Sequence, residues 1–179
     1  MKKRILKTCQ SWNQVEKQII EEMRWLENNI DRFFPDKEKD HGGNIVCKTC
    51  LLRKIALMII YGDIKACEII KASNLENFWL KTEAKKNIYH GSDWHSKTME
   101  KIEKHFKLMG FDVEREPTLN YGRADLGVYK KSEKSLLIEV GTIQLYKLWH
   151  NLHTMPTDTI YLIVSNDEKI IEFQKSKSI

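Results

Sequence analysis

The segment Ser135–Val140 reads Ser-Leu-Leu-Ile-Glu-Val and is apolar at consecutive positions except at Glu139. A strand with one solvent-facing side alternates apolar and polar residues, so this unbroken run predicts a strand that is buried on both faces. Such a strand lies inside a sheet that is covered on each side. It also carries a carboxylate into the interior, which is costly unless the charge is paired or bound to a cation.

The residues around this strand predict an α+β core that begins near residue 90. A helix is predicted over 92–110, where apolar side chains recur at three- and four-residue spacing and Gly110 ends the pattern. A second helix is predicted over 143–153. Strands are predicted at 111–119, 123–129, 135–140, 159–165 and, as a last edge strand, 169–173. The order is helix, three strands, helix, strand, around a mixed central sheet.

The first half of the chain has a helical pattern and no strand pattern. Apolar residues from Trp12 to Leu26 recur at helical spacing and predict one buried stripe. A second helix is predicted from about Lys48 to about Lys71, with an interruption allowed at Gly62–Asp63, and a third over 74–88. All five Trp residues fall at core positions of predicted helices. We therefore expect a helical region over 1–89 packed on a core domain over 90–179.

Charge is distributed unevenly along the chain. Residues 1–90 hold 17 Lys and Arg against 12 Asp and Glu, whereas residues 91–179 hold 13 of each. A basic first half favours a polyanionic partner through counterion release, although a solvated Lys surplus gives the same count. No apolar run is long enough to cross a bilayer and no secretory signal is evident, so we expect a soluble cytoplasmic protein.

Cys47-Lys48-Thr49-Cys50 is a single Cys-x-x-Cys motif. A structural zinc ion needs four ligands, and His41 together with Cys67 or Cys9 is the candidate to complete the set. The same motif also fits a redox-labile disulfide or two free thiols. These three readings stay open.

Asp125 and Glu139 are the acids that the pattern singles out. Asp125 begins a predicted strand after Gly122-Arg123-Ala124, and Glu139 ends the most apolar strand of the chain. Two carboxylates on adjacent antiparallel strands can converge on one divalent ion, and hard oxygen ligands suit Mg²⁺ or Mn²⁺. Such an ion polarises a phosphoryl oxygen and lowers the pKa of an attacking water.

Residues 92–165 resemble the PD-(D/E)XK nuclease superfamily, whose fold is shared by Holliday-junction resolvases and many restriction endonucleases. The likeness rests on the helix that ends Lys107-Leu108-Met109-Gly110-Phe111, on Gly122-Arg123-Ala124-Asp125-Leu126, and on Leu137-Ile138-Glu139-Val140-Gly141. It implies a restriction-endonuclease-like αβββαβ core and a Mg²⁺- or Mn²⁺-dependent nuclease that cuts DNA. It further implies a homodimer, in which the helical region supplies a dimer or DNA-guiding surface. By analogy, a virus or plasmid of a thermophilic archaeon encodes the chain.

The sequence departs from the superfamily at one motif position. The motif places a Lys two residues after the second acid, whereas this chain has Gly141 there. The nearest replacement is Lys147 in the following helix, with Gln144 on the same face three residues earlier. The resemblance implies that Lys147 stabilises charge on the phosphate or orients the water.

Three further residues complete the predicted site. Glu116, or Glu114 of the same strand parity, is the candidate third acid, and His95 is aimed inward from the first helix. Arg123 either contacts a phosphate or pairs with Glu116 across a hairpin. If Lys147 does not act, the rival function is a catalytically silent DNA-binding or regulatory protein with the same fold.

Overall fold

In the computed structural model the chain has an α+β fold. The residues described are 11–30, 33–34, 42–70, 93–119, 122–165 and 169–176. The helices are α1 (Trp12–Ile30), α2 (Lys48–Tyr61), α3 (Asp93–Leu108) and α4 (Leu145–Thr154). The strands are β1 (Ile64–Ile70), β2 (Asp112–Arg115), β3 (Thr118–Leu119), β4 (Gly122–Arg123), β5 (Leu126–Tyr129), β6 (Ser135–Val140), β7 (Thr159–Val164) and β8 (Lys169–Lys175). None of the helices within these ranges combines the length and apolarity that crossing a membrane requires.

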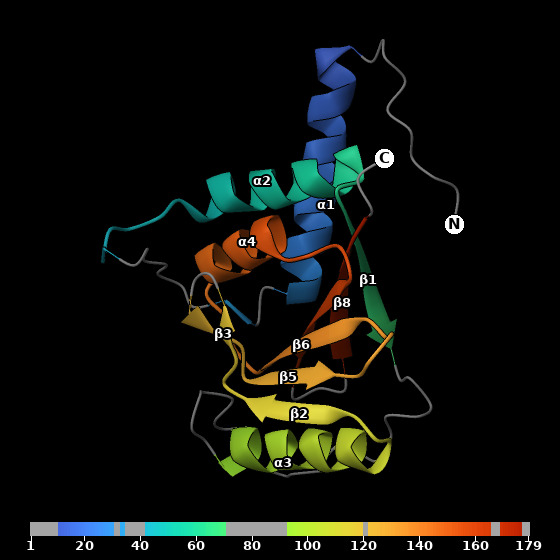
Figure 1. Cartoon of the computed structure of the whole chain (residues 1–179). Helices are drawn as coiled ribbons and strands as arrows, with labels where there is room; N and C mark the ends of the chain where they lie inside the picture. Colours follow the sequence, from blue (N-terminus) through green and yellow to red (C-terminus); the bar gives the residue numbers. More distant parts are fainter. Residues whose placement is uncertain are drawn as a thin grey trace.

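Six strands form one mixed sheet in the order β1-β8-β7-β6-β5-β2 (Figure 1). Strands β6 and β7 are parallel, and every other neighbouring pair in this sheet is antiparallel. A parallel pair needs a crossover connection, which α4 provides. Strands β3 and β4 form a separate small hairpin. The predicted α+β class and the mixed sheet are confirmed.

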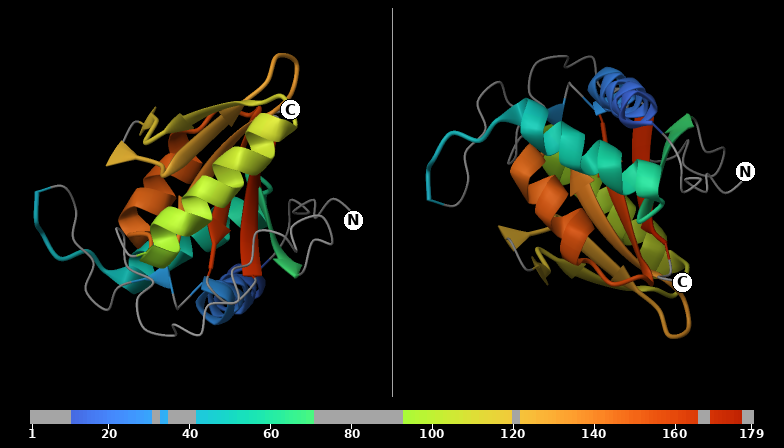
Figure 2. Two further views of the ribbon diagram at one scale, coloured as in Figure 1. Left: turned by 90° about the horizontal axis from the view of Figure 1, so that it is seen from below. Right: turned by 90° about the horizontal axis from the view of Figure 1, so that it is seen from above.

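Both faces of the sheet are covered, as the apolar run in β6 predicts. On one face, Ile138 and Val140 pack with Trp94 and Ile102 of α3. On the other face, Leu137 packs in a larger cluster to which α1, α2 and α4 contribute. Figure 2 shows α3 on the side of the sheet opposite to α2 and α4. Residues of β6 therefore alternate between two apolar layers, and Glu139 shares the face of Leu137.

The helical prediction for residues 64–70 is wrong. Helix α2 ends at Tyr61, where Gly62 adopts φ +81° and its N–H closes the helix on Ile59. Strand β1 then pairs antiparallel with β8 along its whole length. Isolated apolar residues in this segment fit either a helix or a strand, and the partner strand lies more than a hundred residues away, so local periodicity could not choose.

The first half shares its core with the second half. Leu26 and Ile30 of α1 and Ile55 of α2 belong to the same buried cluster as Tyr161 and Phe173 of the sheet. Because β1 flanks β8, β8 is an inner strand rather than the predicted edge strand. Within its described residues, the first half is thus not wholly helical, and α1 and α2 share one buried cluster with the sheet. The predicted helix over 74–88 lies outside the described residues.

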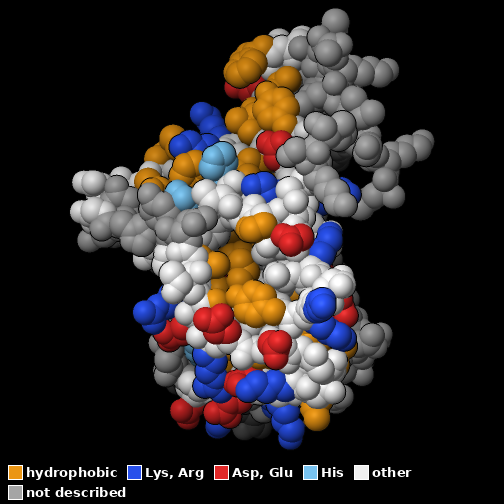
Figure 3. Space-filling view, in the orientation of Figure 1, with side chains coloured by type: hydrophobic (Ala, Val, Ile, Leu, Met, Phe, Trp, Pro, Cys, Tyr) orange, Lys and Arg blue, Asp and Glu red, His pale blue; other side chains and the backbone are white. Residues whose placement is uncertain are grey.

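The predicted stripe of α1 is buried only in its second half. Leu26 and Ile30 are fully buried, whereas Trp12 is 73% exposed among the described residues. Hydrophobic side chains are visible over the upper part of α1 in Figure 3. The prediction that every Trp is a core residue is therefore wrong for Trp12, and Trp79 lies outside the described residues.

Candidate functional site

Asp125 and Glu139 meet where the β5–β6 ladder ends. The last paired position is Leu126 opposite Ile138, and Asp125 and Glu139 are the residues next to this pair at that end of the ladder. The backbone N–H of Asp125 donates to the carbonyl of Ile138 at 3.1 Å, which holds the two chains together at this point. Both acids are buried, at 5% and 3% exposure. The structure therefore brings the two predicted acids to one end of the sheet.

One carboxylate oxygen of Asp125 contacts two neighbouring groups. Its Oδ2 accepts a hydrogen bond from the N–H of Val140 at 2.6 Å. The same oxygen lies 3.3 Å from Nε2 of His95, which is buried in the first turn of α3. His95 thus reaches the site from the α3 side of the sheet, as the inward-facing position of its side chain predicted.

Glu139 is held from the opposite side of the sheet. Its Oε1 lies 2.8 Å from Nζ of Lys147 in the first turn of α4 and accepts a hydrogen bond from the hydroxyl of Tyr161 at 2.7 Å. No hydrogen bond among the described residues falls on Oε2. Burial raises the pKa of Glu139 to about 7, the Lys147 ammonium opposes that rise, and the Asp125 carboxylate adds to it. The two acids therefore interact electrostatically.

The cation beside Glu139 comes from helix α4. Gly141 adopts φ +91°, a left-handed conformation that a lysine would adopt only with strain. The side chain of Lys147 is 21% exposed. A Cβ added to Gly122 of the β3–β4 hairpin would lie 4.0 Å from Cε of Lys147, so the hairpin passes beside the lysine stem. The lysine is placed beside Glu139 through α4 rather than through β6.

Tyr161 and Asn151 belong to the site, and the sequence analysis did not identify them. Tyr161 lies on β7 and is fully buried, and its hydroxyl accepts a hydrogen bond from Nδ2 of Asn151 at 3.3 Å. Burial and the nearby Glu139 carboxylate raise the pKa of Tyr161 well above its ordinary value, so the phenol keeps its proton. The signal was present, because Asn151 follows Lys147 by four residues and so shares its helix face. Tyr161 also interrupts an otherwise aliphatic strand.

Glu116 does not join the two buried acids. It adopts φ +51° and its half-exposed carboxylate pairs with Arg123 at 2.8 Å across the hairpin. Of the two roles predicted for Arg123, the structure shows the pairing with Glu116. Gln144 is exposed at the N-cap of α4 and its side chain makes no capping hydrogen bond. Glu114 pairs in register with Gly127 and is also exposed.

The donors at the sheet end fit a hard cation held by two carboxylates. Within the described ranges, no three His, Cys, Asp or Glu side chains converge to hold a metal ion. Mg²⁺ commonly takes only one or two protein carboxylates and fills its remaining positions with water and substrate phosphates. Asp125 and Glu139 supply that number.

The predicted zinc ligands are dispersed in the described part of the chain. Cys47 caps α2, and its sulfur accepts from the N–H of Cys50 at 3.4 Å. Both thiols are exposed and free. Cys67 lies on β1 opposite Glu172, and His41 and Cys9 lie outside the described residues. Among the described residues, the structure thus brings together only the two cysteines of the motif.

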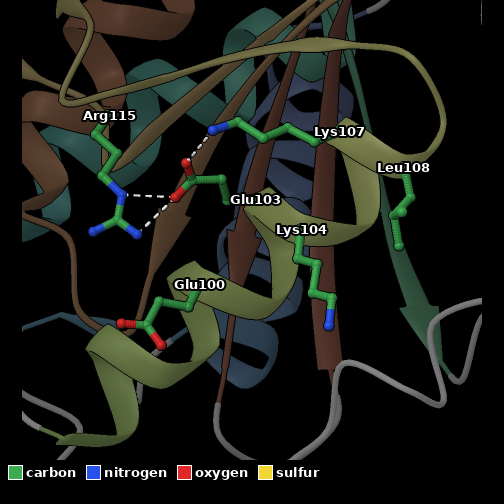
Figure 4. Close-up of a pocket in the computed structure, with 6 residues that line it drawn as sticks. All are labelled: Glu100, Glu103, Lys104, Lys107, Leu108 and Arg115. Atoms are coloured by element: carbon green, nitrogen blue, oxygen red, sulfur yellow. Dashed lines mark hydrogen bonds and ion pairs between the residues drawn. The ribbon is translucent and has the colours of Figure 1, made fainter.

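A shallow groove on the outer side of α3 is separate from the buried acids. It is lined by Glu100, Glu103, Lys104, Lys107, Leu108 and Arg115 (Figure 4). Glu103 bridges Lys107 and Arg115, each at 2.6 Å, so these charges satisfy one another. Around α3, acidic and basic side chains are interspersed on the face drawn in Figure 3. The groove therefore has the character of a solvated ion-pair network rather than a binding site.

Comparisons of the chain with protein-family models, with curated proteins and with solved structures find no match in any of the three. The assignment of a function thus depends on the chemistry of the site itself.

Proposed function

We propose that the protein is a metal-dependent nuclease that hydrolyses DNA phosphodiester bonds. The observation that supports this most directly is the pair of buried acids, Asp125 and Glu139, at one sheet end, with Nζ of Lys147 2.8 Å from Glu139. Burying two acids and a lysine at the end of inner strands lowers stability, so stability alone does not explain this arrangement. Perturbed acids with a specific charged partner are typical of functional sites.

Asp125 and Glu139 would hold Mg²⁺ or Mn²⁺. The Oε2 atom of Glu139 carries no hydrogen bond among the described residues and is the natural donor atom on that side. When bound, the ion supplies positive charge that polarises a phosphoryl oxygen and lowers the pKa of an attacking water.

The other residues have separate roles in this proposal. Lys147 donates to a phosphate oxygen and stabilises the negative charge that develops on it. His95 fixes the Asp125 carboxylate from the α3 side. Arg123 is released from Glu116 to contact the DNA backbone, since an exposed ion pair of this kind is weak. Gln144, exposed at the start of α4, is a further DNA contact.

The order of elements supports the likeness to the PD-(D/E)XK core. Helix α3, strands β2, β5 and β6, helix α4 and strand β7 follow one another as in that superfamily, with the β3–β4 hairpin inserted. We further propose that the protein acts on DNA as a cytoplasmic homodimer, with α1 and α2 as the dimer or DNA-guiding surface. By the same analogy, an archaeal virus or plasmid encodes it.

The alternative function is a catalytically silent DNA-binding protein with the same fold. Two observations favour it. Gly141 stands at the position where the superfamily motif has a Lys, and Glu116 pairs with Arg123 instead of joining Asp125 and Glu139 as a third acid of the site. The two functions differ in whether DNA is cut, which a single assay decides.

The test uses the full-length protein on supercoiled plasmid and on four-way DNA, with Mg²⁺, Mn²⁺ or EDTA. We expect cutting with either metal, no cutting in EDTA, and loss of cutting in Asp125→Asn and Glu139→Gln. Glu133→Gln is the matched control, because Glu133 is exposed in the β5–β6 turn and pairs only with Lys130 among the described residues. Tight DNA binding without cutting supports the silent protein. Cutting that survives both acid substitutions rejects the proposed site.

A further inference from the structure

The buried hydrogen bonds behind Glu139 form a directed chain. Nδ2 of Asn151 donates to the hydroxyl oxygen of Tyr161 at 3.3 Å, and that hydroxyl donates to Oε1 of Glu139 at 2.7 Å. Asn151 is 2% exposed and Tyr161 is fully buried. The chain thus runs from Asn151 on α4 through Tyr161 on β7 to the acid on β6.

The direction of this chain follows from the atoms. A phenol has one proton to donate, and a carboxylate is a stronger acceptor than an amide oxygen, so the proton of Tyr161 goes to Glu139. Asn151 must then present its amide nitrogen, because the phenol oxygen can only accept on that side. Oδ1 of Asn151 is left buried with no hydrogen-bond partner in the described part of the chain. An unsatisfied buried acceptor is unfavourable, so the orientation is held in spite of a stability cost.

The consequence for Glu139 is geometric. Both of its hydrogen-bonding partners, Lys147 and Tyr161, contact Oε1. Lys147 is partly exposed on a long flexible stem, whereas Tyr161 is rigid and enclosed in the main core cluster. The phenol is therefore the contact that fixes the rotation of the carboxylate, and it leaves Oε2 without a hydrogen bond from the described residues.

We propose that Tyr161 and Asn151 are positioning residues, which lock Glu139 through Oε1 so that Oε2 is available to a divalent cation. This inference rests on the proposed metal-dependent function and assigns two residues to it. Neither residue touches the cation or the DNA. Groups that orient a metal ligand typically change metal affinity by about 10- to 100-fold when they are removed.

The test measures Mn²⁺ binding to the full-length protein without DNA, by calorimetry or by the electron paramagnetic resonance of free Mn²⁺. We expect Tyr161→Phe to weaken Mn²⁺ binding by about 10- to 100-fold. Tyr129→Phe is the matched control, since it removes the same hydroxyl from β5, whose Tyr129 pairs with Asp112 at the opposite end of the strand from Asp125. Thermal melting in EDTA shows whether each variant is folded.

A second variant tests the direction of the chain. Asn151→Asp replaces the donor by an acceptor, which competes with Glu139 for the phenol proton while the hydroxyl stays in place. We expect this variant also to bind Mn²⁺ at least about tenfold more weakly, and it decides the question if Tyr161→Phe does not fold. If folded Tyr161→Phe binds Mn²⁺ with wild-type affinity, the inference about Tyr161 and Asn151 is wrong, but the proposed function stands. If Tyr161→Phe does not fold, the same result in Asn151→Asp leads to the same conclusion. If the wild-type protein shows no Mn²⁺ binding that Glu139→Gln removes, the proposed function fails as well.

Discussion

Nζ of Lys147 lies 2.8 Å from Oε1 of Glu139, although the lysine is on α4 and the acid is on β6. The crossover from β6 to the parallel strand β7 requires a helix at this place, and the first turn of that helix lies next to the end of β6. A lysine in this turn reaches the acid without occupying a strand position. The contact thus places a cation beside Glu139, although Gly141, two residues after the acid, has no side chain to supply one.

The first prediction concerns Lys147. We expect Lys147→Met to reduce metal-dependent DNA cleavage by about 10²- to 10³-fold, because a preorganised donor to a developing negative charge is removed. The measurement is the single-turnover rate on plasmid DNA with Mg²⁺. Lys130→Met, at an exposed turn, is the control and should keep its rate. A fully active Lys147→Met would show that the lysine has no catalytic role.

The second prediction concerns the pH dependence of stability. The pKa of Glu139 is raised to about 7 in the folded protein, so the folded state binds this proton more tightly than the unfolded state. The contribution of Glu139 to stability is therefore present at low pH and is lost as pH rises from about 4.5 to about 7, by at most about 3 kcal/mol. Urea unfolding in EDTA at pH 5 and pH 8 measures it. Glu139→Gln should flatten this part of the pH dependence, and an unchanged slope would contradict the assignment.

The third prediction concerns Gly141. The substitution Gly141→Lys should lower the free energy of unfolding by about 1–2 kcal/mol, because φ is +91° at this position. Gly141→Ala should cost a similar amount, since the strain comes from the backbone. A lysine variant that is as stable as the wild type and cuts faster would show that the backbone here readily changes conformation.

The fourth prediction concerns the shared core. Ile55 of α2 is fully buried in the cluster that also contains Tyr161, so Ile55→Ala should lower the free energy of unfolding by about 2–5 kcal/mol. Ile45→Ala, at a side chain that is 79% exposed, should change it by less than about 0.5 kcal/mol. Helical circular dichroism and Trp fluorescence should report one transition. Two separate transitions would indicate that α2 and the sheet unfold independently.

The fifth prediction concerns the thiols. Hydrogen bonds from Cys50 lower the pKa of Cys47, whereas the contact with Cys47 raises the pKa of Cys50 and burial raises that of Cys67. Cys47 should therefore react fastest with iodoacetamide near neutral pH. Trypsin cleaves after Lys48 and so separates Cys47 from Cys50, which allows mass spectrometry to follow each thiol. Equal rates at the three cysteines would contradict this order.

The sequence alone was enough for those features that local pattern controls. The apolar run around Glu139 required a strand covered on both faces, and β6 is such a strand. Gly110 ended the predicted helix, and it takes the left-handed conformation that a helix end favours. Asp125 and Glu139 were recognisable because an acid within or beside an apolar strand is costly to bury without a partner charge or a cation.

Only the tertiary structure decided the features that depend on distant partners. The segment from Ile64 becomes a strand because β8 offers a free edge, which no local periodicity reveals. Glu116 has a positive φ angle beside a hairpin, and its side chain pairs with Arg123. Alternation along a regular strand therefore did not predict the direction of this side chain. Tyr161 and Asn151 look like ordinary core residues in the sequence. They join Glu139 only because β6, α4 and β7 are folded against one another, and long-range packing of this kind sets which polar groups meet.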